Sequence, residues 1–420
     1  MRFLLPAALL LTSAAAQVPD EDHFAEEVTT LANDPKVAAV LDALPAMRAQ
    51  SFEDVVRISE VPAPPFGEGP RAALIKDMLR ETGFGRTGQD DAGNVVVYRE
   101  GRTGERTVAV LAHIDTVFPP ETDVTVTREG RTLTGPGVGD NARGVVAMLE
   151  IARAIAEADL TTEDDIMLVG TVGEEGLGDL SGVRHLFREG APPIHAALVI
   201  DGGEEAKLVT SAVGSNRYRV TYRGPGGHSW GDFGDPNPAH ALGHAIARLD
   251  ELGAEVAAGQ DAKVSYSVGT VEGGTSVNSI PFEASMLIDL RSGDPDALAA
   301  MDAAFQQAMQ DALATENEAA PTPLTIAIEP VGQRPAGEGD PSAALVQRAV
   351  AALRAVGVEP TLEASSTDAN VPLSLGVPAV TIARGGVSRG AHSASESWTD
   401  QDSQKMTRAA LLTLLAEAGY

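Results

Sequence analysis

The sequence predicts an α/β fold: a mixed, mostly parallel sheet sandwiched by helices, with a smaller α+β domain of ferredoxin-like type inserted into it. Two features of the 420-residue chain lead to this prediction. Short, nearly unbroken apolar runs are typical of strands that are buried on both faces of a sheet. They lie at residues 95–98, 108–112, 166–172, 196–200 and 378–382. Between 212 and 330, by contrast, apolar and polar residues alternate, which is typical of strands with one face in water.

The elements of the larger domain follow from local patterns. A polar helical stretch at about 21–50 precedes a proline-rich turn at 61–65, and apolar residues recur at helical spacing over 72–79. A long amphipathic helix falls between the second and third apolar runs. Its apolar side consists of Val145, Met148, Leu149, Ile151, Ala152 and Ile155. Helices between buried strands are what a sheet covered on both faces requires.

The inserted domain begins where apolar and polar residues start to alternate along the chain. Tyr218, Val220 and Tyr222 alternate with polar residues and predict a strand. A helix over about 241–249, strands at 264–270 and 284–290, a helix at about 295–313 and a last strand at 324–328 follow. This order is that of an open-faced sandwich. We place it at 212–330, between the two parts of the larger domain at 17–211 and 331–420.

Composition limits the classes of partner and of chemistry. Lys and Arg number 31 and Asp and Glu 60, which gives a formal charge of −29, and 43% of the residues are hydrophobic. Such an acidic surface argues against nucleic acid and anionic lipid as partners and in favour of a well-solvated surface. The chain has no cysteine, so it has no disulfide and no thiolate nucleophile. Any metal must be held by His, Asp or Glu.

The N-terminal residues predict a signal peptide. Met1-Arg2 precedes an apolar run at 3–11 and the small residues 13–16, a pattern that predicts cleavage after Ala16 and an exported protein, periplasmic or secreted. The run is shorter than the ~20 residues that a membrane span needs. Because there is no cysteine to carry a lipid, we expect no stable membrane anchor.

Acidic and histidine residues stand at the ends of the buried runs, where α/β sheets place their ligands. They are His113, Asp115, Asp140, Glu174, Glu175, Asp201 and His392. Singly, each has an ordinary structural explanation; Asp140, for example, could cap the helix that follows it. Together, two His and three carboxylates can complete the ligand sets of two Zn²⁺ ions if one carboxylate bridges them. Glu174 is then free to act as a base.

The motifs around these residues resemble those of a known family. They are LAHIDTV at 111–117, GPGVGD at 135–140, GEEG at 173–176, DGG at 201–203, GGHS at 226–229 and AHS at 391–393. The chain resembles the dinuclear zinc exopeptidases and deacylases related to peptidase T, carboxypeptidase G, carnosinase and acetylornithine deacetylase, and most of all the peptidase T-like members. The resemblance covers nearly all of the chain after residue 16.

The resemblance implies a ligand set for two Zn²⁺ ions per chain, with Co²⁺ or Mn²⁺ as substitutes. Asp140 bridges the ions in such proteins, and its peptide bond to Asn141 is cis. The remaining ligands fall into two pairs: Glu175 with His392, and His113 with Asp201.

Catalytic roles are also implied by the resemblance. Glu174 would take a proton from a water between the two metals and pass it to the leaving amine. Asp115 would orient the ring of His113 and fix its tautomer.

For the inserted domain, the resemblance implies a lid that also forms a homodimer. His228 would reach the active site of the partner subunit and help to bind the oxyanion. Asn278 and Arg291 match positions that bind the carboxylate end of the substrate, although Arg291 could equally be a surface residue that ends a strand. The sequence after His228, Ser-Trp-Gly-Asp-Phe-Gly, is longer than is usual in the deacylases.

These expectations favour an exported dizinc metallopeptidase that acts on small peptides. Relatives with Asp at the position of Asp201 are mostly aminopeptidases and dipeptidases, so we expect a di- or tripeptide aminopeptidase. An N-acyl-amino-acid deacylase or a carboxypeptidase of the same family is the main alternative, because those relatives mostly carry Glu there.

Three other interpretations are weaker. Residues 386–390 fit the nucleophile elbow of a serine hydrolase, but only His392 follows them and no Asp lies between. Residues 137–142 fit a dinucleotide fingerprint, but they follow a polar stretch instead of a buried strand, and we reject this interpretation. An exported protein that binds metal or peptides without chemistry is the third, and a free carboxylate at Glu174 argues against it.

Overall fold

The structure is a computed structural model that describes residues 22–318, 320 and 322–420. The predicted signal peptide at 1–16 lies outside the described residues. Within them, no helix is both long enough and apolar enough to span a membrane.

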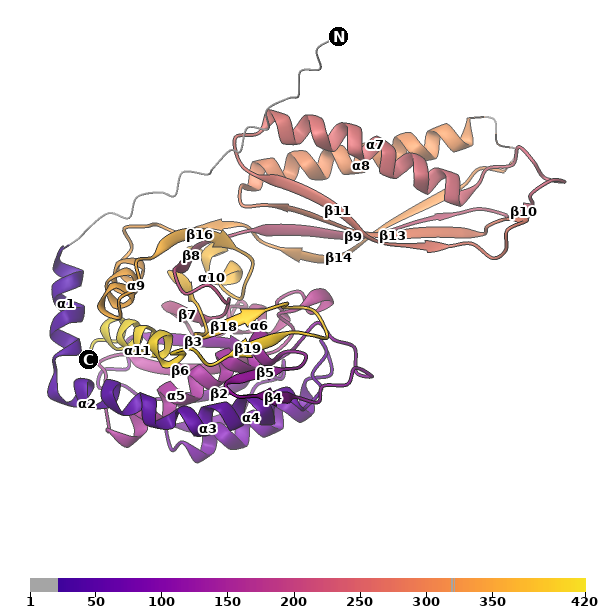
Figure 1. Cartoon of the computed structure of the whole chain (residues 1–420). Coiled ribbons are helices and arrows are strands. Elements are labelled where there is room, and N and C mark those ends of the chain that lie inside the picture. Colours follow the sequence, from indigo (N-terminus) through magenta and orange to yellow (C-terminus); the bar gives the residue numbers. More distant parts are fainter. Residues whose placement is uncertain (1–21, 319, 321) are drawn as a thin grey trace, which may run out of the picture.

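A nine-stranded mixed sheet forms the centre of the larger domain (Figure 1). Its order is β1 (Arg86–Gln89), β2 (Val95–Arg99), β6 (Asp165–Thr171), β3 (Thr107–His113), β7 (Ala196–Ile200), β17 (Ala379–Ile382), β8 (Lys207–Ala212) and β15 (Gly337–Glu338), with β16 (Thr361–Ser365) also pairing with β8. The central strands β6, β3, β7 and β17 run parallel, whereas β1, β2 and β15 pair antiparallel with their neighbours. The predicted α/β class is confirmed, and the parallel part lies where the apolar runs are.

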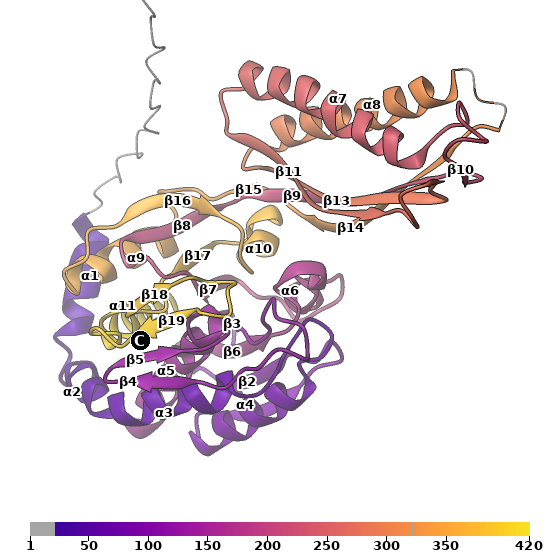
Figure 2. The same cartoon turned by 45° about the vertical axis from the view of Figure 1, so that its right-hand side comes forward.

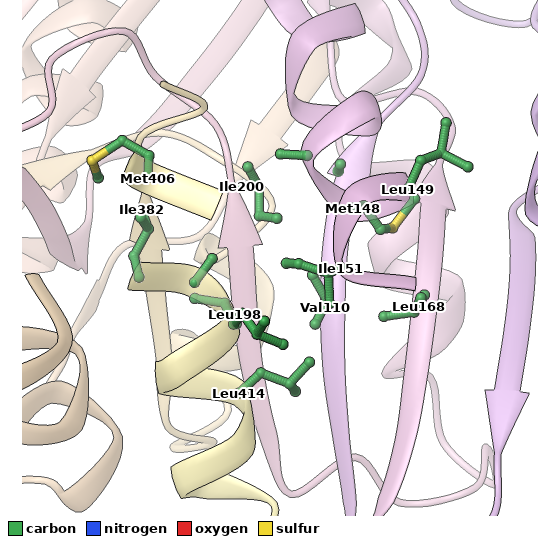
Figure 3. Packing of buried hydrophobic residues seen from close by; sticks show 14 of the residues in the cluster. Val110, Met148, Leu149, Ile151, Leu168, Leu198, Ile200, Ile382, Met406 and Leu414 are labelled. Carbon is green, nitrogen blue, oxygen red and sulfur yellow. The ribbon is translucent and has the colours of Figure 1, made fainter. Parts of the chain in front are cut away.

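Helices cover both faces of this sheet, because successive strand residues point to opposite sides. Val108 and Val110 belong to the core beneath the larger helices, and Ala109 and Leu111 to the core beneath the short ones. The larger helices are α1 (Asp22–Ala32), α2 (Pro35–Ala43), α3 (Arg48–Ser59), α4 (Gly69–Glu81), α5 (Gly144–Glu157), α9 (Ala344–Ala355) and α11 (Gln404–Glu417); the short ones are α6 (Ser181–Leu186) and α10 (Asn370–Ser374). Figure 3 shows residues of α5 and α11 packed against the central strands.

The stretch at about 21–50 is helical as expected, but it is divided into several helices. The helix is interrupted before Asp34, whose side chain accepts hydrogen bonds from the backbone N–H groups of Lys36 and Val37 and so caps α2. Pro35 takes the first helical position of α2, where a missing N–H costs nothing. A 3₁₀ turn, η1 (Leu44–Met47), follows before α3.

The inserted part forms a separate four-stranded antiparallel sheet with two long helices on one face (Figures 1 and 2). Its order is β11 (Val264–Gly273), β13 (Glu283–Ser292), β9 (Gly214–Arg223) and β14 (Thr325–Arg334), covered by α7 (Pro238–Gly259) and α8 (Pro295–Asn317). Tyr218, Val220 and Tyr222 face these helices, as their alternation predicts. A small ladder of β10 (Gly227–His228) and β12 (Ser279–Ile280) lies at the far end of this sheet (Figure 2).

A third sheet was not expected from the sequence. It joins β18 (Val387–Arg389), β19 (Ser397–Thr399), β5 (Thr132–Thr134) and β4 (Thr127–Glu129). These strands are only three residues long and mostly polar, so they carry no periodic signal. They hold the loop that ends in Asp140 beside the loop that contains His392. Short turns η2 (Val138–Arg143) and η3 (Gly176–Gly178) complete the chain.

A buried ion pair between Arg143, which directly precedes α5, and Glu150 of α5 also binds the C-terminal helix, because both of its members form hydrogen bonds with Thr407. Arg143 and Glu150 are both fully buried and lie 3.0 Å apart, and Glu150 also accepts a hydrogen bond from Thr407. We expect Glu150→Ala to lower the free energy of unfolding by ~3–5 kcal/mol in urea denaturation, because the buried guanidinium would lose its counter-charge. The exposed pair of Arg80 and Asp77 provides the control: Asp77→Ala should cost ~0–1 kcal/mol. Equal effects of the two substitutions would contradict this account.

Candidate active site

The parallel strands carry their polar residues to one edge of the central sheet. His113 is the last residue of β3, Glu174 and Glu175 follow β6, and Asp201 follows β7 directly. Because the carboxyl ends of parallel strands meet at the same edge, residues that are far apart in sequence converge there. This is the placement that the sequence predicts for them.

His113 is held from both sides of its ring. Its Nε2 lies 3.1 Å from Oδ1 of Asp140, and its Nδ1 lies 3.4 Å from Oδ1 of Asp115. Burial opposes protonation of His113, but the hydrogen bonds with Asp115 and Asp140 outweigh it and hold its pKa well above the ordinary value. Asp115 is fully buried and also accepts backbone hydrogen bonds from Glu174 and Glu175, at 3.1 and 2.8 Å. Asp115 therefore fixes the His113 ring and the Glu174–Glu175 loop together.

Asp140 stands at the centre of the cluster. Its side chain lies 3.1 Å from His113, 3.5 Å from His392 and 3.0 Å from Arg384. Burial would raise the pKa of Asp140, but Arg384 and then the two imidazoles hold it well below the usual range. The peptide bond from Asp140 to Asn141 is cis, as the resemblance implies.

The backbone before Asp140 is fixed by a carboxylate that the sequence analysis did not single out. Glu396 accepts hydrogen bonds from the backbone N–H groups of Gly137, Gly139 and Asp140, at 3.0, 2.8 and 2.7 Å. Amides that are already bound to a carboxylate cannot cradle a pyrophosphate, so the loop is not a dinucleotide site. In the sequence, only the closeness of Glu396 to His392 indicated that Glu396 belongs to the site.

The opposite side of the cluster is formed by Glu175 and His392. Oε1 of Glu175 lies 3.1 Å from Nε2 of His392, and the hydrogen bonds that His392 donates to the carboxylates of Asp140 and Glu175 raise its pKa to about 10. Ligand atoms of His113, Asp140 and Glu175 all lie within 4.8 Å of one another. Imidazole nitrogens and carboxylate oxygens are ligands that Zn²⁺ accepts. The donor set therefore fits a metal ion.

Asp201 lies at the same edge but has a cation as its neighbour. Its Oδ1 lies 3.3 Å from Nη1 of Arg384, a buried residue just after β17 that also contacts Asp140. Burial and then the charge of Asp140 raise the pKa of Asp201. Asp201 is not in the group formed by His113, Asp140 and Glu175. Arg384 was missed by the sequence analysis, although a charged residue directly after a buried run was a usable signal.

Glu174 is buried beside this donor set and is held by a different partner. Nη1 of Arg334, at the end of β14, donates to Oε1 of Glu174 at 3.0 Å, and Nη2 donates to its backbone oxygen. Burial raises the pKa of Glu174 well above its ordinary value, and Arg334 only partly offsets this. Nothing in the sequence pointed to Arg334, because it belongs to the inserted sheet, 160 residues further along.

These side chains line a cavity of about 440 Å³ between the two domains. Glu174, Arg291 and Arg334 face it together with the donor set. His228 and Asn278 are not among its lining residues; they lie at the far end of the inserted sheet, on and beside β10 and β12. There, Nδ1 of His228 accepts hydrogen bonds from the backbone of Trp230 and Gly231. The structure thus brings Arg291 to the cavity of its own chain, but not His228 or Asn278.

The serine of the alternative hydrolase motif is not activated. Oγ of Ser388 is buried and has no hydrogen-bond partner among the described residues. A serine nucleophile requires an adjacent base. This geometry gives no support to a serine hydrolase.

Comparison with known proteins assigns the family. The model of peptidase family M20/M25/M40 matches residues 109–417, well over half of the chain. The chain belongs to this family. The resemblance predicted from the motifs is confirmed, and M20 membership makes the chain a metal-dependent hydrolase of the metallopeptidase type.

Individual relatives of this M20 protein are distant. YqjE of Bacillus subtilis, which is uncharacterised, is 24% identical over 318 residues, or 74% of this chain and 79% of YqjE. An Ajellomyces dermatitidis protein named "Probable carboxypeptidase" is 28% identical over 226 residues, which span only about half of each protein, 49% and 50%. The crystal structure of aminopeptidase PepT from Bacillus cereus matches with a TM-score of 0.68 at 19% identity, covering 88% of this chain and 98% of that chain. At that identity, the match shows the fold.

Proposed function

We propose that this M20 protein is an exported dizinc metallopeptidase that removes the amino-terminal residue from small peptides. One observation carries the proposal: the buried carboxylate of Glu174 faces the same cavity as His113, Asp140 and Glu175, and it is held there by Arg334 instead of by these ligand-type residues. A protein that only binds metal or peptides has no use for such a carboxylate. The export rests on the sequence pattern at 1–16.

Five residues would hold the two ions in the arrangement that the family resemblance implies. Asp140 would serve both, Glu175 and His392 would complete one site, and His113 and Asp201 the other. Bound zinc supplies a Lewis acid that polarises the scissile carbonyl and makes water a better nucleophile near neutral pH.

The proton steps belong to Glu174. One carboxylate oxygen accepts the proton of the attacking water and then delivers it to the nitrogen of the leaving amine, so the peptide bond breaks and the carboxylate is regenerated. Burial assists this task because a raised pKa makes Glu174 a stronger base than an exposed glutamate. Arg334 holds the carboxylate in place at 3.0 Å.

The role of Arg334 gives a pH test. A carboxylate must be ionised to accept a proton, and the adjacent guanidinium stabilises the ionised form. We expect Arg334→Gln to raise the pKa of Glu174 further, so that the acidic limb of the kcat/KM profile moves to higher pH, whereas Arg334→Lys should restore most of the wild-type profile. An unchanged limb in Arg334→Gln would mean that Arg334 does not act on the base.

Cleavage from the carboxyl end is the second candidate. The "Probable carboxypeptidase" relative and the position of Arg291 in the cavity favour it. The Asp at position 201 favours the aminopeptidase. The two candidates can be separated with one tripeptide of three different residues, prepared in free, N-acetylated and C-amidated forms. Mass spectrometry of the products shows which residue is released from each form. We expect the free and amidated peptides to lose their first residue and the acetylated one to resist. Faster cleavage of the acetylated peptide would assign the chain to the carboxypeptidase or deacylase branch.

We also propose a homodimer through the inserted domain, in which His228 completes the site of the partner subunit. Its support is that His228 lies away from the cavity of its own chain (Figure 2). Removing an oxyanion donor typically lowers kcat ~10²–10³-fold. We expect His228→Ala and Glu174→Gln to be nearly inactive alone, and their mixture to regain activity after subunit exchange, because each heterodimer has one site with both residues. Absence of recovery in proven heterodimers would contradict the proposal.

A further inference from the structure

Three arginines gather on the helix-free face of the inserted sheet, at the end next to the cavity. Because Tyr218, Val220 and Tyr222 face α7 and α8, the alternate residues of β9 point the other way. In the ladder, Arg217 is opposite Asp289 of β13 and Gly332 of β14. Ser215 is opposite both Arg291 and Arg334. Residues opposite each other in an antiparallel pair share a face, so the three guanidinium groups belong to one surface.

The charges on this face are balanced far from the cavity but not beside it. Further along β9, Arg219 is opposite Glu329, and Arg223 lies 2.8 Å from Glu283. Near the cavity, the residue of β14 opposite Arg217 is Gly332, which has no side chain to balance the charge. The charge of Arg334 is already paired with that of Glu174.

Asp289 is shared by the two remaining guanidinium groups, those of Arg217 and Arg291. Its oxygens lie 3.6 Å from Nε of Arg217 and 2.7 Å from Nε of Arg291. Among the described residues, neither Arg217 nor Arg291 forms an ion pair with a second carboxylate, although the charge of Asp179 also acts on Arg217. This edge of the cavity therefore carries an excess of positive charge.

Arg217 is the less exposed of the two, with 14% of its side chain accessible against 41% for Arg291. Arg217 reaches across to the edge of the central sheet that carries the candidate active site. There its Nη1 donates a hydrogen bond of 2.6 Å to the backbone oxygen of Gly176, the residue that follows Glu175. Burial and then the charge of Arg334 lower the pKa of Arg217, and Arg291 adds to this, while Asp289 and Asp179 offset it only in part. A buried cation crowded by other cations gains most from an anionic ligand.

We propose that Arg217 and Arg291 form a paired anion site for substrates whose C-terminal residue is Asp or Glu. The inference rests on the proposed peptidase function and narrows its substrate class. Arg291, which matches a position that binds the carboxylate end of the substrate, takes the terminal carboxylate, and Arg217 takes the acidic side chain. Both guanidinium groups contact the same small carboxylate of Asp289, so both lie within reach of one acidic residue. The chain as a whole has a net charge of −29, so the cluster of arginines that lines this side of the cavity is a local feature of the site.

The test compares the dipeptides Ala-Glu and Ala-Gln, which are nearly equal in size and differ in charge. We expect the wild-type enzyme to show a kcat/KM ~10–100-fold higher for Ala-Glu, mostly through KM, as a charged hydrogen bond allows. Arg217→Gln should remove this preference, because it lowers kcat/KM far more for Ala-Glu than for Ala-Gln. Arg219→Gln, on the same strand and face but not among the residues that line the cavity, makes the same charge change and should keep the preference.

Binding of free L-glutamate and L-glutamine to the metal-loaded protein, measured by calorimetry, separates the two proposals. Tighter binding of glutamate that Arg217→Gln abolishes, together with no hydrolysis of either dipeptide, would support the anion site and overturn the peptidase. Equal kcat/KM for both dipeptides in wild type would overturn the anion site and leave the peptidase standing. An equal loss on both dipeptides in Arg217→Gln would also overturn it, because that result indicates a structural role.

Discussion

Replacing Glu174 with Gln is expected to lower kcat by ~10²–10⁴-fold or more while the fold and the metal content stay unchanged, because the proton acceptor is lost and the donor set is not. Gln keeps the size of the side chain and can still meet Arg334, which lies 3.0 Å from the carboxylate. Steady-state kinetics and elemental analysis of the same preparation measure both effects.

Glu204→Gln is the matched control for this substitution. Glu204 also lines the cavity, but it is exposed and lies outside the group of ligand-type residues. We expect it to keep nearly full activity. Loss of metal on Glu174→Gln would show that Glu174 and Glu175 have exchanged roles, and near-normal turnover would remove Glu174 from the mechanism.

Replacing Asp140 with Ala is expected to abolish activity together with the binding of both ions. Asp140 is the residue whose carboxylate lies near both His113 and His392, at 3.1 and 3.5 Å. Asp201→Ala should mainly weaken one ion, because the other donors remain grouped without it. Elemental analysis and zinc-binding calorimetry on the two variants measure the difference.

A structural explanation of that result has its own control. Asp140 also forms an ion pair with Arg384, so loss of the Asp140 carboxylate could disturb packing as well as metal binding. Asp140→Asn keeps the size of the side chain and should retain the fold by circular dichroism while metal affinity falls. If Asp140→Ala keeps one tightly bound ion and full activity, the bridging assignment is wrong.

The placement of the donor set was predictable because position along a strand carries it. His113, Glu175 and Asp201 each follow an apolar run, and parallel strands bring such ends together. The partners of these residues were not predictable in the same way. Arg334 reaches Glu174 from another sheet, and Glu396 meets three backbone N–H groups that no sequence pattern marks.

The fold shows the same division between local and long-range information. Buried runs and alternating strands identified both large sheets, because each pattern has its own period. The small sheet of β4, β5, β18 and β19 joins segments more than 250 residues apart through strands of three residues. Its pairing depends on where the rest of the chain places those segments. That sheet is what sets His392 beside Asp140, so the last step in assembling the site lay beyond local patterns.

Metal dependence of peptide hydrolysis is the decisive measurement for a dizinc peptidase. The protein is stripped with a chelator, and zinc is then added back in steps while hydrolysis of a free tripeptide is followed. We expect no hydrolysis by the stripped protein and recovery that is complete at about two zinc ions per chain, the number for which Asp140, Glu175, His392, His113 and Asp201 provide ligands. Undiminished hydrolysis by the stripped protein, or full recovery at one ion, would contradict it.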